Sequence, residues 1–119
     1  MEIRARDAAE PFTTADGSTI RSLLDRTNAT VANQSLAEAT IEAGEATVRH
    51  YHGDSEEFYY LVEGSGEMEL DGERAAVSAG DSILIPPGAW HQIRADETGP
   101  LRLLCACAPP YRHEDTFFS

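Results

Sequence analysis

The most informative stretch of this chain of 119 residues, for both fold and function, is Gly44-Glu-Ala-Thr-Val-Arg-His50-Tyr-His52-Gly-Asp-Ser-Glu-Glu57-Phe-Tyr-Tyr-Leu-Val-Glu-Gly64. His50 and His52 are one residue apart, so on a β-strand their side chains project from the same face. Glu57 comes five residues after His52, which is the wrong parity for one continuous strand. The Gly53-Asp-Ser55 turn resolves the difference, because it folds Glu57 onto a neighbouring antiparallel strand that faces the two histidines.

A second segment, Gly80-Asp-Ser-Ile-Leu-Ile-Pro86-Pro-Gly88-Ala-Trp-His91, supplies a third histidine. His91 follows a Pro-Pro-Gly turn and begins another strand, so it can approach from a third side. Three imidazoles and one carboxylate suit a borderline divalent ion such as Fe, Mn, Ni, Co, Cu or Zn. We therefore expect one divalent transition metal per chain, bound by His50, His52, Glu57 and His91. In octahedral geometry two positions would stay open for a substrate or for oxygen.

The remaining sequence predicts a single all-β domain. Short runs of alternating apolar and polar residues recur about every ten residues and are separated by turns rich in Gly and Pro, a pattern typical of a β-sandwich or barrel. Asp71-Gly72, between two such runs, is the strongest hairpin signal. Residues 20–26 fit a short helix or a strand equally well. The predicted strands cover residues 31–41, 46–52, 57–62, 67–70, 74–78, 82–85, 90–95 and 101–107.

The spacing of these residues resembles the two motifs of the cupin family. Gly44, five residues, His50-Tyr-His52, four residues, Glu57, six residues and Gly64 resemble the first motif. Gly80, five residues, Pro86-Pro-Gly88, two residues and His91 resemble the second. The second motif normally ends in Asn, where this chain has Ala95, but that Asn is not a metal ligand in the family.

The resemblance implies a single-domain cupin β-barrel, jelly-roll-like, with two antiparallel sheets. The barrel would span residues 31–107, with an N-terminal arm and edge strand over 1–30 and a C-terminal tail packed on the barrel over 108–119. Cupins of this size commonly form homodimers, which we expect here as well.

Glu56 is the alternative to Glu57 as the carboxylate ligand, because the family allows three or four residues between the second histidine and the carboxylate. Only Glu57 is followed by six residues and then Gly64, so the spacing favours Glu57. His113, in the tail, is expected to be solvated and not to bind the metal.

Strand parity extends the site around the metal. If Glu57 faces inward, Tyr59 and Leu61 do so too, while Phe58 and Tyr60 face outward. Tyr59 is the candidate catalytic residue, although barrel packing would also explain it. In similar cupins the last strand lines the cavity, and its cysteines would then serve either packing or function. The expected substrate pocket consists of Ala37, Ala39, Leu61, Ile93, Leu103, Cys105 and Cys107.

The charge balance excludes several classes of partner. The chain has 21 acidic and 9 basic residues and a formal net charge of −12, so it would repel nucleic acids and anionic membranes. No apolar stretch is long enough for a signal peptide or membrane span. Cys105 and Cys107 lie two apart on one strand, too far apart for a disulfide, which favours a reducing cytoplasmic location.

These observations favour a metal-dependent enzyme that acts on a small organic molecule, with a dioxygenase as the first hypothesis. A metal-dependent isomerase, lyase or cyclase would use the same ligands. A protein that only binds an organic acid or sugar, or a metal-containing scaffold, is the alternative outside enzymes.

Overall fold

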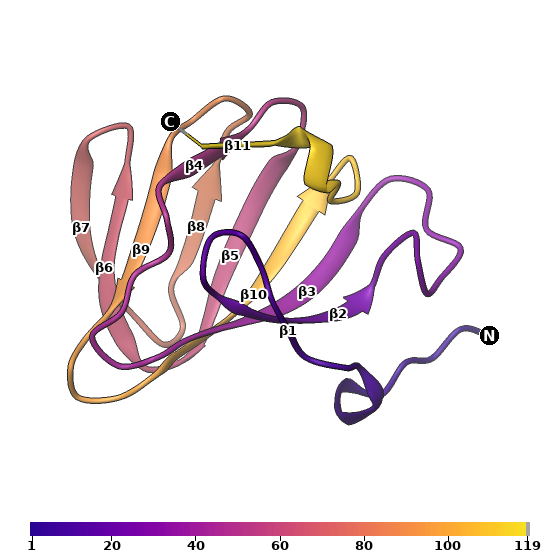
Figure 1. The fold of residues 1–119 in the computed structure, drawn as a ribbon, viewed down its shortest axis with the longest axis horizontal. Helices are drawn as coiled ribbons and strands as arrows, with labels where there is room; N and C mark the ends of the chain where they lie inside the picture. The colour runs from indigo at the N-terminus through magenta and orange to yellow at the C-terminus, as the bar shows by residue number, and fades with distance from the viewer. Residues whose placement is uncertain (119) are drawn as a thin grey trace.

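The structure, a computed structural model that describes residues 1–118, consists of two antiparallel β-sheets packed face to face (Figure 1). One sheet has the strand order β1-β2-β3-β10-β5-β8 and the other the order β11-β4-β9-β6-β7. The all-β fold with two antiparallel sheets is therefore confirmed. The elements are η1 (Arg6–Ala8), β1 (Phe12–Thr13), β2 (Thr19–Leu24), β3 (Ser35–Ile41), β4 (His50–His52), β5 (Glu56–Glu63), β6 (Ser65–Leu70), β7 (Glu73–Ser78), β8 (Ser82–Ile85), β9 (His91–Ala95), β10 (Leu101–Ala108), η2 (His113–Asp115) and β11 (Thr116–Phe118).

Most predicted strands occur close to their predicted bounds, and the ambiguous residues 20–26 contribute the strand β2. The strands predicted over 31–41 and 46–52 are both shorter in the structure, and β3 begins only at Ser35. Ala46 makes only an isolated bridge with Arg94, and regular pairing starts at His50. The reason is a competing partner, since the backbone N–H of Val48 donates to the carbonyl of Asp16 in the turn between β1 and β2 at 2.7 Å.

The core lies between the two sheets and follows the alternation of the strands. In β5, Glu57, Tyr59 and Leu61 are buried, whereas Phe58 and Tyr60 are 52% and 47% exposed. The apolar cluster is built from residues of both sheets and consists of Ala39, Ile41, Tyr59, Leu61, Met68, Ile85, Ala89, Ile93, Ala95, Leu101 and Leu103. Burial of such side chains is the main stabilising contribution to a fold of this kind.

Gly64, which closes the first motif, is required by a close approach of two chain segments. Its φ is +90°, and a Cβ atom built there would lie 2.3 Å from the carbonyl oxygen of Pro100. Any side chain would therefore clash with backbone and strain the turn. This glycine lets β5 turn into β6 directly beside the start of β10.

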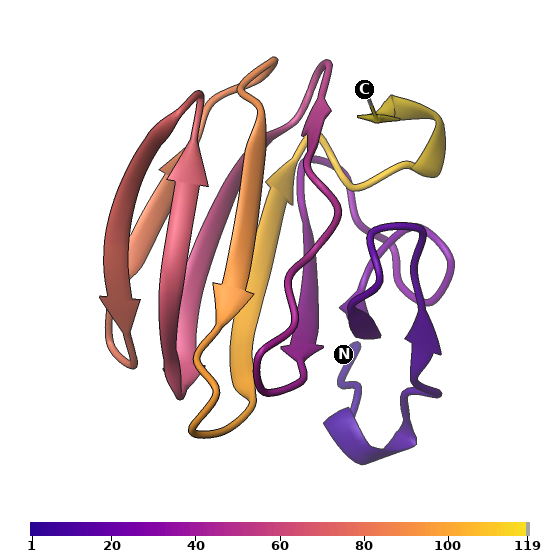
Figure 2. The ribbon, with the colours of Figure 1, turned by 60° about the vertical axis from the view of Figure 1, so that its left-hand side comes forward.

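The two ends of the chain lie on the same side of the sheets, as Figure 2 shows. The hairpin of β1 and β2 extends the larger sheet through the pairing of β2 with β3. Residues 116–118 go further than a tail packed on the barrel, because they pair with β4 and add a strand to the smaller sheet. The β1–β2 hairpin and β11 thereby reach the part of the barrel that contains the motif histidines.

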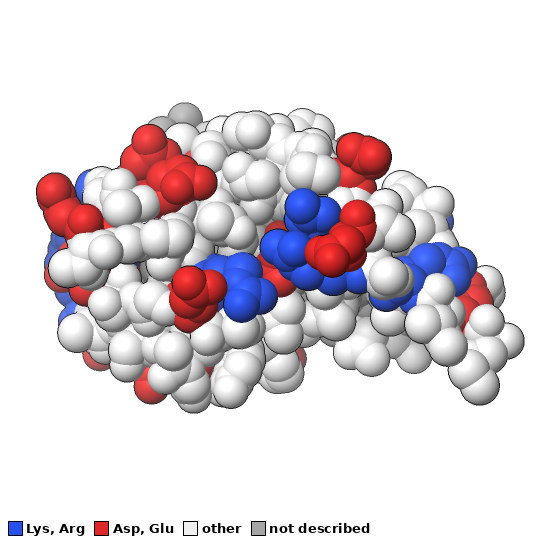
Figure 3. Space-filling view, turned by 90° about the horizontal axis from the view of Figure 1, so that it is seen from below, with Lys and Arg blue, Asp and Glu red and all other residues white. Residues whose placement is uncertain are grey.

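Charged side chains of both signs are in contact on the surface, as the blue and red atoms of Figure 3 show. Arg6 and Arg102 approach the carboxylate of Glu38 to 2.8 and 3.1 Å. Burial raises the pKa of Glu38, but the hydrogen bonds from the two arginines outweigh it and hold that pKa below its usual value.

Within residues 1–118 the structure has no helix with the length and apolar character needed to cross a membrane.

Candidate metal centre

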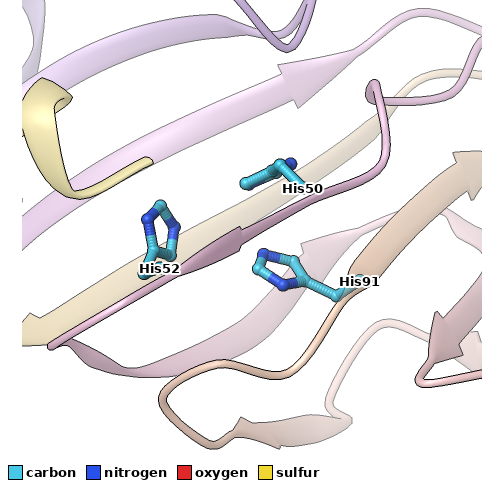
Figure 4. A group of neighbouring side chains, drawn as sticks. All are labelled: His50, His52 and His91. Carbon is cyan, nitrogen blue, oxygen red and sulfur yellow. The ribbon is translucent and has the colours of Figure 1, made fainter. Parts of the chain in front are cut away.

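Three buried histidines lie close together in the smaller sheet, where β4 pairs with the start of β9 (Figure 4). His50 and His52 project from one face of β4, and His91 is the first residue of β9 and pairs directly with His50. The His91 ring lies 4.2 Å from the His50 ring and 5.6 Å from the His52 ring, measured between centroids. One nitrogen of each ring lies within 4.8 Å of the corresponding atoms of the other two. This arrangement fits a shared metal ion.

Hydrogen bonds at Nδ1 leave the Nε2 atoms free to bind a metal. Nδ1 of His50 lies 2.7 Å from the carbonyl oxygen of Val48, and Nδ1 of His91 lies 3.0 Å from that of Ala89. A carbonyl oxygen only accepts, so each Nδ1 atom carries a proton, and in the neutral ring this leaves Nε2 with a lone pair. Nδ1 of His52 lies 3.2 Å from the hydroxyl of Thr116 in β11.

Glu57 faces this group from β5. Its Oε1 atom lies 3.4 Å from Nε2 of His52 and 3.5 Å from Nε2 of His91. Ligand atoms that each bind one ion at about 2.1 Å are about 3.0–3.4 Å apart, so these distances fit a common ion. Burial raises the pKa of Glu57, but His52 and His91 hold it at about 2, so the carboxylate is ionised at neutral pH.

Two atoms of the centre have no partner of their own. Oε1 of Glu57 and Nε2 of His91 are buried without a hydrogen bond among the described residues. Buried polar atoms are nearly always paired, and such exceptions call for an explanation. A metal ion between the two atoms would satisfy both. Glu56 is exposed, and so is His113 in η2, so neither residue joins the group.

A cavity of about 570 Å³ opens beside the histidines. His50, His52 and Glu57 line it, together with Tyr59. Six of the seven residues expected in the pocket also line it: Ala37, Ala39, Ile93, Leu103, Cys105 and Cys107. Leu61 does not, because it is fully buried in the apolar cluster. Its parity is the one expected, but it lies beyond the reach of the cavity.

The model of the cupin domain family matches residues 37–107, most of the barrel. The chain belongs to the cupin family. It is 47% identical over 110 residues to the uncharacterised protein MJ1618 of Methanocaldococcus jannaschii, covering 92% of this chain and 88% of that protein.

Solved structures share the fold of this cupin. The polyketide cyclase RemF of Streptomyces resistomycificus is 24% identical, with a TM-score of 0.79 over 97% of this chain and 89% of RemF. The nucleoside dehydratase Pac13 of Streptomyces is 20% identical, with a TM-score of 0.78 over all of this chain and 94% of Pac13. At these identities the likeness concerns the fold.

The cysteines of this cupin are both reduced, and one of them touches the centre. Sγ of Cys107 donates to Oε2 of Glu57 at 3.3 Å. Burial, and next the negative charge of Glu57, raise the pKa of both thiols, so each keeps its proton at neutral pH. Burial likewise raises the pKa of Tyr59, whose ring lies 6.0 Å from the ring of His91. Tyr59 is therefore a neutral phenol.

Several cavity residues of this cupin were not anticipated from the sequence. They come from the two ends of the chain and are Asp16, Ser18, Ile20, Tyr111, Thr116 and Phe118. The residues Ala15-Asp-Gly-Ser18 are typical of a turn, but they do not predict that this turn lies close to His50. That contact depends on the pairing of β2 with β3, which local patterns do not encode.

Proposed function

We propose that this cupin is a metalloenzyme that holds one divalent transition metal through His50, His52, Glu57 and His91 and converts a small organic molecule in the adjacent cavity. The observation that supports this best is the unpaired state of Glu57 Oε1 and His91 Nε2. A buried polar atom without a partner costs about 1–3 kcal/mol, and more when it is charged. A bound ion would remove that cost, because it would be a ligand-binding partner for both atoms.

The chain's own residues would prepare the centre for chemistry. A divalent ion, when bound, supplies Lewis acidity to an oxygen of the substrate. The carbonyls of Val48 and Ala89 fix the tautomers of His50 and His91, and Cys107 holds the second carboxylate oxygen of Glu57. The walls of the cavity are mostly apolar, which lowers the polarity around the centre and strengthens electrostatic interactions there.

Tyr59 favours, as a second candidate beside the oxygenase, a reaction assisted by a neutral hydrogen-bond donor. Its phenol keeps its proton and lines the cavity beside the candidate metal ligands, so it can donate a hydrogen bond to an oxygen of the substrate. An isomerase, lyase or cyclase needs such a donor, whereas an oxygenase needs O₂. RemF is a polyketide cyclase and Pac13 a nucleoside dehydratase, which is consistent with chemistry that does not consume O₂ on this fold.

The experiment has two stages. Metal content is first measured for the parent, His52→Ala, Glu57→Ala and His113→Ala after loading with iron, manganese, nickel or zinc. Near-stoichiometric metal in the parent and in the His113→Ala control is expected, with loss in the other two, and retention there would contradict the ligand assignment. Phenols, polyketide fragments, small acids and sugars are then screened for turnover with an oxygen electrode. Turnover with O₂ uptake supports the oxygenase, turnover without it the second candidate, and tight binding without turnover a binding protein.

A further inference from the structure

Asp16 is a carboxylate beside the metal centre that the ligand set does not use. It lies in the turn between β1 and β2, drawn in indigo in Figure 1, and it lines the cavity. Its Oδ2 atom lies 3.9 Å from Nε2 of His50, too far for a hydrogen bond. The side chain of Asp16 is only 17% exposed.

The two oxygens of Asp16 have different surroundings. Oδ1 accepts three hydrogen bonds from within the turn, from the hydroxyl of Thr14 at 2.5 Å and from the backbone N–H and hydroxyl of Ser18 at 2.9 and 2.6 Å. Among the described residues, Oδ2 accepts none. The turn is also fastened to the barrel by the hydrogen bond from Val48 N–H to the carbonyl of Asp16. Asp16 is thus held rigidly with one free oxygen directed toward His50 and the cavity.

We propose that Oδ2 of Asp16 accepts a hydrogen bond from a hydroxyl or amino group of the molecule bound next to the metal, and so selects donor-bearing, uncharged ligands over carboxylates. This inference rests on the proposed function. A divalent ion with the Glu57 carboxylate has a net charge of +1, which would attract anions. The negative charge of Asp16 brings the net charge of the site to zero. Its free oxygen repels a carboxylate on the ligand and favours a hydrogen-bond donor.

Other charged residues of the cavity wall do not compete for this role. Arg26, His113 and Glu114 are exposed, and the guanidinium of Arg112 pairs with Asp54 at 3.1 Å. Asp25 is half-buried, but both its oxygens are occupied, Oδ1 by Thr27 and Oδ2 by the hydroxyl of Ser22. Asp25 therefore provides a matched control, because Asp25→Asn removes the same charge from the same wall without freeing or removing an available acceptor.

The test compares two probes of one ring size, catechol and benzoate, by calorimetry on zinc-loaded protein, since zinc has no redox chemistry. The variant is Asp16→Asn, which keeps Oδ1 and its three hydrogen bonds. The parent should prefer catechol, and Asp16→Asn should lower that preference about tenfold or more, the usual effect of one hydrogen bond to a charged group. Asp25→Asn should leave it within about twofold, and the zinc content of both variants should equal that of the parent.

Each other result counts against the assignment. An unchanged preference in Asp16→Asn, an equal drop in Asp25→Asn, or no binding of catechol to the zinc-loaded parent would overturn it. Loss of zinc from Asp16→Asn would make Asp16 a metal ligand instead and would also overturn it. A parent that holds zinc but shows any of these results leaves the proposed metal centre intact, whereas a parent that holds no metal overturns both proposals.

Discussion

Sγ of Cys107 and Oε2 of Glu57 are joined by a hydrogen bond of 3.3 Å between residues that lie directly opposite each other on β10 and β5. The bond fixes the rotation of the carboxylate and leaves Oε1 directed at His52 and His91. A residue two positions away on the same strand, Cys105, lies opposite Tyr59 instead.

Cys107→Ala should therefore weaken metal binding about tenfold to a hundredfold, the usual cost of losing a partner that orients a ligand. Cys105→Ala is the matched control and should bind the metal as the parent does. Competition with a chromophoric chelator measures both affinities. Equal affinities for the two variants would show that the thiol of Cys107 only fills space.

Removing the metal should lower the melting temperature, because an ion that binds only the folded state stabilises it by mass action. At a free ion concentration 100 times Kd the stabilisation is about 2.7 kcal/mol, which corresponds to roughly 10 °C for a domain of this size. Differential scanning calorimetry with and without chelator measures the shift. Glu57→Ala should show almost no shift when metal is added, and a full shift in that variant would contradict its role as a ligand.

Tyr59→Phe should lower turnover about 10²–10⁴-fold and leave metal content unchanged, since it deletes the hydroxyl and keeps the buried ring. Tyr60→Phe makes the same change on the neighbouring residue, whose side chain is 47% exposed on the outer face. Its rate should match the parent rate. If Tyr59→Phe also matches the parent, Tyr59 is a packing residue.

Glu38 should give the fold a defined dependence on pH. Its pKa is lowered in the folded state, so its contribution to stability is complete above the ordinary glutamate value of 4.5 and is lost as the pH falls through the folded pKa. Glu38→Gln should cost about 1 kcal/mol at pH 7, a modest value because water screens the partly exposed arginines, and less below pH 4.5. Urea unfolding at several pH values measures this. Glu63→Gln, which affects only the exposed partner of Arg102, should show little of this dependence.

The outer face of the larger sheet should form a homodimer with a second copy of the chain. Phe58 and Leu84 are paired in register and 52% and 53% exposed, and Tyr60 lies beside them. Glu63 and Arg102 border the patch with both signs of charge, which suits a two-fold interface. Light scattering should give twice 13.0 kDa for the parent and 13.0 kDa for Phe58→Glu. Val48→Glu, at a residue 49% exposed elsewhere, is the control, and dissociation of that variant alone would place the interface elsewhere.

The grouping of the three histidines with Glu57 could be predicted because its signals are local. His50 and His52 share a face by strand parity, and Glu57 reaches them through a short turn. Asp16 and Thr116 could not be predicted, since each reaches the centre through strand pairing across a large separation; Thr116 is 64 residues from His52. Strand parity also correctly predicted that Leu61 faces inward. How deep the cavity reaches depends on the packing between the two sheets, which cannot be predicted from the sequence of one strand.

The participation of β11 has a consequence for how the protein is made. The ring of His52 is oriented by the hydroxyl of Thr116, and β4 is covered along its outer edge only when residues 116–118 pair with it. A ribosome that has just added His52 must add 64 more residues before that hydroxyl exists. His50, His52 and Glu57 are therefore synthesised in the first half of the chain and His91 later, but the hydroxyl that orients His52 is present only after Thr116 has been added.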